Sequence, residues 1–226
     1  MPLRKTLLIT GEHYHVFSRS SQKREIFLGI DADIFQICLK FYTRTNLYPK
    51  FSYYLKHQKE FPLTYLDRLV TIEAYCIMPT HFHLLLKQEV DGGITDYLQR
   101  SLVSYSHYYN QKHQEIGPVF AGRFKAVQIE TEEQFMHVSR YIHLNPTSVG
   151  LVGDPRSYPY SSIQDYQKIS PDLPVDPSQV LGCFASKESY LKFVLSRKDY
   201  QRKLEYIKHT LIDYEYESYE PGSKLL

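Results

Sequence analysis

The sequence predicts an α+β fold: a ferredoxin-like split βαβ antiparallel sheet with helices on one face, followed by a C-terminal helical region. Three observations predict it. Four short segments have the apolar pattern of strands, two longer segments have apolar residues at helical spacing, and a capping sequence marks a further helix. The resulting order, β-α-β-β-α-β with another helix after it, is that of a split βαβ sheet.

The first half of the sheet is predicted from residues 13–88. Residues 13–19 (HYHVFSR) are expected to form a strand, and residues 31–44 place their apolar side chains at helical spacing. Residues 46–68 are rich in aromatic residues and lysine and lack a clean period, so we interpret them as a connecting insertion. Apolar and polar residues alternate over 70–76, and an apolar run follows a Met-Pro-Thr turn, which predicts a hairpin.

The second half of the sheet needs one more helix, one more strand and a closing helix. Residues 94–111 have apolar and tyrosine side chains at helical spacing, and residues 124–129 are the fourth strand candidate. Thr131 begins the capping sequence Thr-Glu-Glu-Gln, so a helix is expected to start there. It is expected to end near Asn145, because Pro146 restricts the residue before it.

A domain boundary is predicted near residue 150. Residues 1–150 form the main predicted domain, and five prolines fall within the 23 residues 155–177. We therefore interpret residues 151–226 as a Pro-rich connection, a helical C-terminal region and an acidic, tyrosine-rich tail. Apolar residues at helical spacing indicate one or two helices there: Leu191, Val194, Leu195, Leu204, Ile207 and Leu211.

Composition excludes several classes of protein. Of the 226 residues, 42% are apolar and 23% are charged, which is typical of a globular chain rather than a disordered or membrane-spanning one. The N-terminal apolar run is too short for a signal peptide, so a cytoplasmic location is expected. Cys38, Cys76 and Cys183 are odd in number and far apart, which argues against a disulfide framework or a zinc ribbon; we expect all three in the core.

The histidines at the start of the second hairpin strand are candidate metal ligands. Strand side chains alternate, so His81 and His83 are expected on one face with their Cα atoms about 7 Å apart. Two imidazoles can bind one divalent ion, but oxygen ligands must complete the shell. The spacing alone is weak evidence, because His13 and His15 have it too and an H-x-H pair is more often a packed pair.

Context separates the two pairs. The second lies in YCIMPTHFHLLLK, and the segments GPVFAGRFKAVQIE, RYIHLNPTSVGLV and SYPYSS follow it in the chain. With these segments, residues 10 to 166 resemble the IS200-like HUH tyrosine transposases, especially the branch of REP-associated tyrosine transposases. The insertion at 46–68 looks longer than the family's usual connection, and the chain after residue 166 has no recognisable motif.

The resemblance implies a metal-dependent transposase that cleaves and rejoins single-stranded DNA, at hairpin or repeat ends, through a 5′-phosphotyrosine intermediate. The family's nucleophile lies on a helix about sixty residues after the histidines, a position that Tyr141 matches at 58 residues after His83. Asn145 lies one helical turn further on the same face, so its amide oxygen is the candidate third ligand. A helix-terminal role for Asn145 is the alternative.

The implied cofactor is Mg²⁺ or Mn²⁺, because oxygen-rich, open coordination suits phosphate chemistry better than a closed zinc site. The implied partner is single-stranded or hairpin DNA, with the protein acting as a monomer or a homodimer. Basic residues near the motifs are candidate DNA contacts, each with a solvated surface charge as the alternative: Arg19, Arg123, Lys125 and Arg140.

Three alternatives stay open at this point. Tyr105 is the rival nucleophile, although it lies only 22 residues after His83 and suits packing or base stacking better. An HUH replication or mobilisation nuclease would share the chemistry. A domesticated DNA-binding protein would have kept the fold and lost catalysis, although both histidines and Tyr141 are intact.

Overall fold

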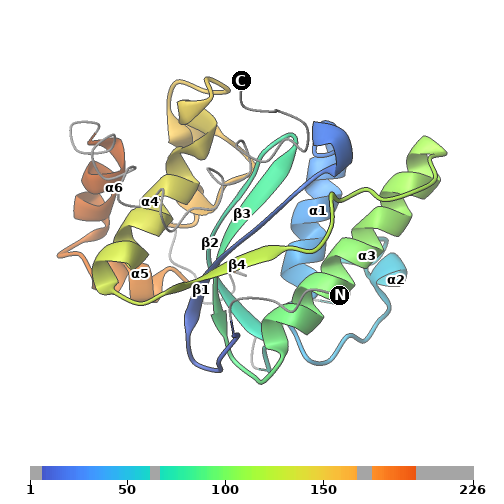
Figure 1. Cartoon of the computed structure of the whole chain (residues 1–226), viewed down its shortest axis with the longest axis horizontal. Helices are drawn as coiled ribbons and strands as arrows, with labels where there is room; N and C mark the ends of the chain where they lie inside the picture. Colours follow the sequence, from blue (N-terminus) through green and yellow to red (C-terminus); the bar gives the residue numbers. More distant parts are fainter. Residues whose placement is uncertain (1–6, 62–66, 167–174, 197–226) are drawn as a thin grey trace, which may run out of the picture.

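A four-stranded antiparallel sheet is the centre of the protein. The computed structural model describes residues 7–61, 67–166 and 175–196. In sheet order the strands are β2 (Val70–Ile77), β3 (His81–Gln88), β1 (His13–Arg19) and β4 (Lys125–Ile129), and each pairs antiparallel with its neighbours (Figure 1). This is the ferredoxin-like order, so the predicted fold class is confirmed.

Helices α1 (Ile30–Phe41) and α3 (Gly93–His113) pack together on one face of the sheet. Strand alternation directs Phe82 to this face, where its ring lies 5.2 Å from that of Phe35 in α1. The ring of Phe35 also lies 4.4 Å from that of Phe27 and 4.9 Å from that of Tyr105 in α3. Each of these four side chains is at most 1% exposed, so they form an aromatic core between the helices and the sheet.

Helix α4 (Glu132–Ser148) lies across the opposite face, so the sheet separates it from α1 and α3 in Figure 1. This differs from the prediction, which placed helices on one face only. The physical reason is that α4 has an apolar side of its own to bury: its Phe135, Val138 and Ile142 are at most 7% exposed. Antiparallel sheets often leave one face to solvent, but this one is covered on both.

The start of α4 is confirmed and its end is not. The Oγ1 of Thr131 accepts a hydrogen bond from the backbone N–H of Gln134 at 3.2 Å, as the capping sequence predicts. The helix continues through Pro146 to Ser148, so the predicted end near Asn145 is wrong. Proline removes one N–H from the helix but leaves its own carbonyl, which accepts from Leu151 N at 2.9 Å and closes the last turn.

The described residues after 150 share a hydrophobic core with the sheet. The hydroxyl of Tyr158 donates to the carbonyl of Ile77 at 2.8 Å, and that of Tyr166 donates to the carbonyl of Glu73 at 2.7 Å. Four short helical segments follow one another here: η2 (Pro155–Ser157), η3 (Ser162–Gln164), α5 (Ser178–Gly182) and α6 (Lys187–Leu195). They lie on the α4 side of β2 (Figure 1).

Helix α6 confirms the predicted helix around Leu191, and a reciprocal cap between Ser186 and Ser189 explains where it begins. The second group of predicted helical residues, with Leu204, Ile207 and Leu211, and the acidic tail lie outside the described residues. In the part of the insertion that the structure describes, residues 46–61 and 67–68, there is one short helix, α2 (Phe51–Tyr54). A 3-10 turn, η1 (Ser21–Lys23), follows β1.

The burial of the cysteines tests an expectation from composition. Cys38 and Cys76 are buried free thiols, whereas Cys183 is only half-buried, so the expectation that all three belong to the core holds for two. Among the residues that the structure describes, no helix is long and apolar enough to cross a membrane.

The aromatic core predicts a large effect of truncating its central ring. Phe35→Ala is expected to lower the free energy of unfolding by about 3–5 kcal/mol, because it removes a buried ring that the rings of Phe27, Phe82 and Tyr105 contact. Urea unfolding followed by circular dichroism measures it. Leu28→Ala, at a side chain 50% exposed, is the control and should change the value by less than about 0.5 kcal/mol.

Candidate active site

His81 and His83 begin β3 directly after a tight turn. The turn is closed by the backbone N–H of Met78 donating to the carbonyl of His81 at 2.8 Å. Alternation then directs both imidazoles to the α4 face, with ring centroids 5.1 Å apart and ring planes perpendicular. His83 is completely buried, whereas His81 is half-buried and its Nδ1 lies 3.0 Å from the Oγ1 of Thr80. The pair is thus accessible from the His81 side.

Tyr141 of α4 lies over this histidine pair. Its ring centroid is 5.3 Å from that of His83 and 6.0 Å from that of His15, and both contacts are edge-on. Its side chain is half-buried, unlike the fully covered core tyrosines of the chain. Residues that are 58 positions apart in the sequence therefore meet at one point on the sheet.

Asn145 lies one turn beyond Tyr141 on α4 and is 4% exposed. Within the described part of the chain, its side-chain Nδ2 is buried without a hydrogen-bond partner. Rotating the Asn145 amide by 180° would exchange Nδ2 and Oδ1 and place the oxygen at this position. The two orientations are distinguished only by the hydrogen bonds that each can make. A buried amide without a hydrogen-bond partner is uncommon, and binding of a cation by the amide oxygen of Asn145 would explain it.

The two histidines form a candidate site for a divalent ion only together with the amide of Asn145. Among the described residues, no three His, Cys, Asp or Glu side chains are arranged to hold a metal. A site built from His81, His83 and Asn145 has two nitrogen donors and one oxygen donor. It therefore suits an ion that takes further oxygen ligands from substrate and water.

His15 is the residue that sequence reasoning missed. Its Nε2 lies 3.0 Å from Nδ1 of His83, and the two buried rings are stacked with centroids 5.1 Å apart. The H-x-H spacing of His13 and His15 was the available signal, but it does not say which histidine joins the site. His13 instead contacts the carboxylate of Glu73, with Nδ1 and Oε2 2.9 Å apart.

Burial sets the charge of the central histidine. Desolvation lowers the pKa of His83 well below its usual range, and the neighbouring His81 and His15 lower it further. His83 is therefore neutral at neutral pH, which is the form that a metal-binding imidazole needs.

Three of the predicted DNA contacts lie near the histidine end of the sheet. Arg19 at the end of β1 pairs with His81, and Lys125 at the start of β4 pairs with Phe17 of β1. Both side chains are half-buried, and Arg123 just before β4 is exposed. These positions are consistent with contacts to a strand of DNA that reaches the site.

Arg140 does not fit the prediction of a DNA contact. Its side chain is 2% exposed, and the guanidinium carbon lies 4.4 Å from the ring centroid of Phe193 in α6. The sequence prediction placed it beside Tyr141, but consecutive helix residues point about 100° apart. Arg140 therefore faces α6 whereas Tyr141 faces the sheet.

Tyr105, the rival nucleophile, is a core residue. It is completely buried, and its hydroxyl donates to the carbonyl of Ile26. Burial raises the pKa of this hydroxyl, so its deprotonation is strongly disfavoured.

The segment after residue 150 holds α4 in place through His143. The Nε2 of His143 lies 2.9 Å from the Oγ of Ser162, and its Nδ1 lies 2.6 Å from the hydroxyl of Tyr190 in α6. The Oγ of Ser162 also accepts from the backbone N–H of Tyr75 in β2 at 2.8 Å. One buried serine thus connects the helix that carries Tyr141 to the edge of the sheet.

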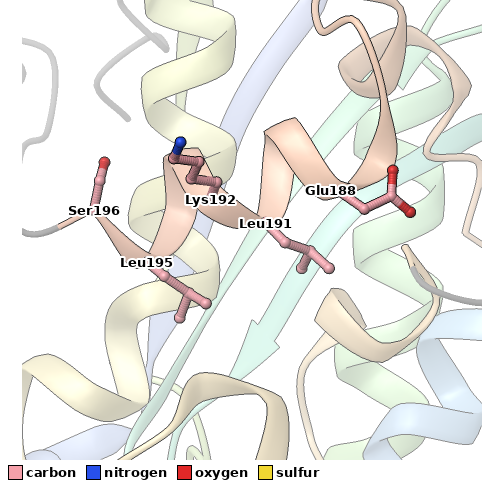
Figure 2. Close-up of a pocket in the computed structure, with 5 residues that line it drawn as sticks. All are labelled: Glu188, Leu191, Lys192, Leu195 and Ser196. Atoms are coloured by element: carbon pink, nitrogen blue, oxygen red, sulfur yellow. The ribbon is translucent and has the colours of Figure 1, made fainter.

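A separate pocket on α6 does not belong to this site. Figure 2 shows its lining side chains, which all come from one short stretch: Glu188, Leu191, Lys192, Leu195 and Ser196. Its lining contains neither His81 nor His83 and lacks Tyr141, so this pocket is separate from the candidate reactive groups.

Comparison with known proteins agrees with the geometry. Residues 57–145 match the model of the family described as IS200-like transposases, a segment that contains His81, His83, Tyr141 and Asn145. A solved structure of a REP-associated tyrosine transposase bound to a REP hairpin has a TM-score of 0.52 at 16% identity. The match covers 78% of this chain and 93% of that one. This likeness establishes the shared fold.

A putative transposase from Deinococcus radiodurans R1 has a TM-score of 0.36 at 11% identity, over 60% of this chain and 91% of that one. That likeness is too weak to support an argument. Curated proteins give no significant match.

The bridging serine predicts a stability effect. Ser162→Ala is expected to lower the free energy of unfolding by about 1–3 kcal/mol, because it leaves the N–H of Tyr75 and a nitrogen of His143 without their buried partner. Thermal and urea unfolding measure it. Ser52→Ala, at an exposed serine, should change stability by less than about 0.5 kcal/mol; equal effects of the two changes would contradict the bridging role.

Proposed function

We propose that this chain is an IS200-like transposase, since residues 57–145 match the model of that family, and that it cleaves and rejoins single-stranded DNA through a covalent bond to Tyr141. The observation that carries the proposal is the 5.3 Å contact between the rings of Tyr141 and His83, which come from different elements and meet on the face of the sheet that α4 covers. A half-buried tyrosine beside two imidazoles is close to the groups that its reaction needs.

The reaction is an exchange of one phosphodiester for another. The Tyr141 hydroxyl gives up its proton as its oxygen attacks the phosphorus, and the bond from the phosphorus to the 3′-oxygen breaks. The released 3′-oxygen takes up a proton and becomes a 3′-hydroxyl, so one proton is lost and one is gained. The 5′-phosphate remains bound to the tyrosine. Attack by a 3′-hydroxyl on this phosphotyrosine reverses the step and rejoins a strand, so no external energy source is needed.

The residues that would hold a divalent cation are His81, His83 and Asn145. Mg²⁺ or Mn²⁺ bound there would supply positive charge to offset the charge that develops on the phosphate in the transition state. His83 is neutral and held by its neighbours, and its edge-on contact with Tyr141 orients the hydroxyl-bearing ring. Such fixed positions lower the entropic part of the barrier.

The DNA substrate we propose is a single strand next to a hairpin or repeat end, contacted by Arg19, Arg123 and Lys125. Support for the substrate class comes from the REP-associated transposase of similar fold, which was solved with a REP hairpin. Basic side chains at the histidine end of the sheet would contact the phosphates and fix the register of the strand.

Trapping the intermediate tests the nucleophile. A pool of hairpin oligonucleotides with randomised single-stranded flanks, labelled at the 3′ end, is incubated with protein and Mn²⁺. The label follows the fragment that keeps the 5′-phosphate, so wild-type protein should show a labelled adduct on denaturing gels. Tyr141→Phe should lose it, because the change removes only the hydroxyl.

Tyr105→Phe is the matched control and should keep the adduct, since its hydroxyl only donates to a carbonyl in the core. Mass spectrometry of the DNA-linked peptide identifies the attached residue. Linkage at Tyr105, or an undiminished adduct in Tyr141→Phe, would falsify the assignment of the nucleophile.

The metal ligands give a second prediction. His81→Ala or His83→Ala should lower the cleavage rate by at least about 100-fold while DNA binding survives, because the cation acts mainly on the transition state. Asn145→Ala should instead raise the Mn²⁺ concentration needed for half-maximal cleavage about tenfold or more, since both imidazoles remain. Cleavage is measured on gels and DNA binding by fluorescence anisotropy. Full cleavage in a chelator would contradict the cation claim.

A further inference from the structure

His15 and His83 form a buried pair whose hydrogen bond determines where the proton of His83 sits. The pair is 1% and 0% exposed, and Nε2 of His15 lies 3.0 Å from Nδ1 of His83. The two residues come from neighbouring antiparallel strands, and their ring planes are inclined by only 16°. A contact at this distance between two ring nitrogens requires one donor and one acceptor.

A neutral imidazole carries its proton on one nitrogen only, so the hydrogen bond has two possible directions. If His83 donates, its proton is on Nδ1 and its Nε2 has a lone pair. If His15 donates, the proton of neutral His83 is on Nε2, which then cannot bind a cation. Because Nδ1 contacts His15, a metal bond from His83 has to be made by Nε2. The two directions therefore differ in whether His83 can act as a ligand.

We propose that His15 is a positioning residue: it accepts the Nδ1 proton of His83 and so leaves the Nε2 lone pair of His83 for the divalent cation. This rests on the proposed function of the site. A metal-binding histidine commonly donates its other ring N–H to a fixed acceptor, which sets its tautomer and its orientation. Here the acceptor is a second imidazole rather than the more usual carboxylate or carbonyl.

The surroundings hold this acceptor in place. The ring of Phe17 packs 5.2 Å from that of His15 and 5.8 Å from that of His83, so it contacts both members of the pair. The ring of Tyr141 contacts the same two imidazoles edge-on. His15 of β1 thus contacts side chains of both β3 and α4. Replacing it changes the surroundings of the proposed ligand His83 and of the proposed nucleophile Tyr141.

His13 shows that the role is specific to one histidine of the H-x-H pair. His13 lies on the same strand and the same face as His15. Its Nδ1, however, contacts the carboxylate of Glu73, and its ring packs against Phe135. The strand register, which sets Phe17 opposite His83, places His15 and not His13 diagonally next to the ligand.

The tautomer can be measured directly in the metal-free protein. Long-range ¹H–¹⁵N correlation spectra at neutral pH distinguish protonated from unprotonated ring nitrogens, and the resonances of His83 are identified by their loss in His83→Ala. We expect wild-type His83 to carry its proton on Nδ1. A proton on Nε2 of wild-type His83 overturns the proposal, and this result needs no variant of His15.

Two variants of His15 separate its chemistry from its bulk. His15→Gln keeps a side-chain oxygen as acceptor, so the tautomer of His83 and the Mn²⁺ affinity should stay within about threefold of wild type. His15→Phe keeps the ring and removes the acceptor, so the proton should move towards Nε2 and Mn²⁺ should bind about 10–100-fold more weakly. Mn²⁺ binding is followed by electron paramagnetic resonance of the unbound ion.

His107→Phe, at an exposed histidine, is the control and should leave both readouts unchanged. Circular dichroism and thermal unfolding establish that each variant is folded. An unchanged Mn²⁺ affinity in folded His15→Phe contradicts the positioning role. Wild-type protein that carries the proton on Nδ1 but does not bind Mn²⁺ supports the role of His15 in setting the tautomer and contradicts the cation in the proposed function.

Discussion

The candidate site depends on the register in which β1 pairs with β3. This register sets Phe17 opposite His83 and Arg19 opposite His81. Alternation along both strands then places the histidines on the face that α4 covers, and Phe82 and Leu84 in the core beneath α1 and α3. A slip of one residue would exchange the two faces. The register that buries Phe82 and Leu84 therefore also sets the positions of His81 and His83, because both depend on the same pairing of β1 with β3.

The second requirement is that α4 stays on the sheet. Its side chains Phe135, Val138 and Ile142 are buried, and His143 adds a buried polar connection to Ser162 and Tyr190. The segment after residue 150 is thus part of the support of the candidate nucleophile, although it contributes no reactive group. Fully satisfied buried hydrogen bonds define one arrangement more sharply than apolar contacts alone, because a shifted helix would leave them unmade.

Much of the fold was predictable because its signals are local. The apolar pattern predicted a strand over residues 13–19, which are the observed bounds of β1. The capping sequence at Thr131 predicted the start of α4. The end of α4 was misjudged, since a proline in the last turn removes only one hydrogen bond and does not by itself stop a helix. The placement of helices on one face was also incomplete, because the apolar residues of α4 predict that this helix packs on the sheet but do not say on which of its two faces.

By itself, the sequence determined the order of elements, the fold class and the residue types that can perform the chemistry: two histidines on one strand face, and a tyrosine and an asparagine one helical turn apart. Only the tertiary structure decided which other side chains join them. It brought His15 to His83 across 68 residues of chain and buried Arg140 under Phe193. The physical reason is that period and capping depend on neighbours in the sequence. Hydrogen-bond partners and burial depend instead on the strand register and on which helix covers which face.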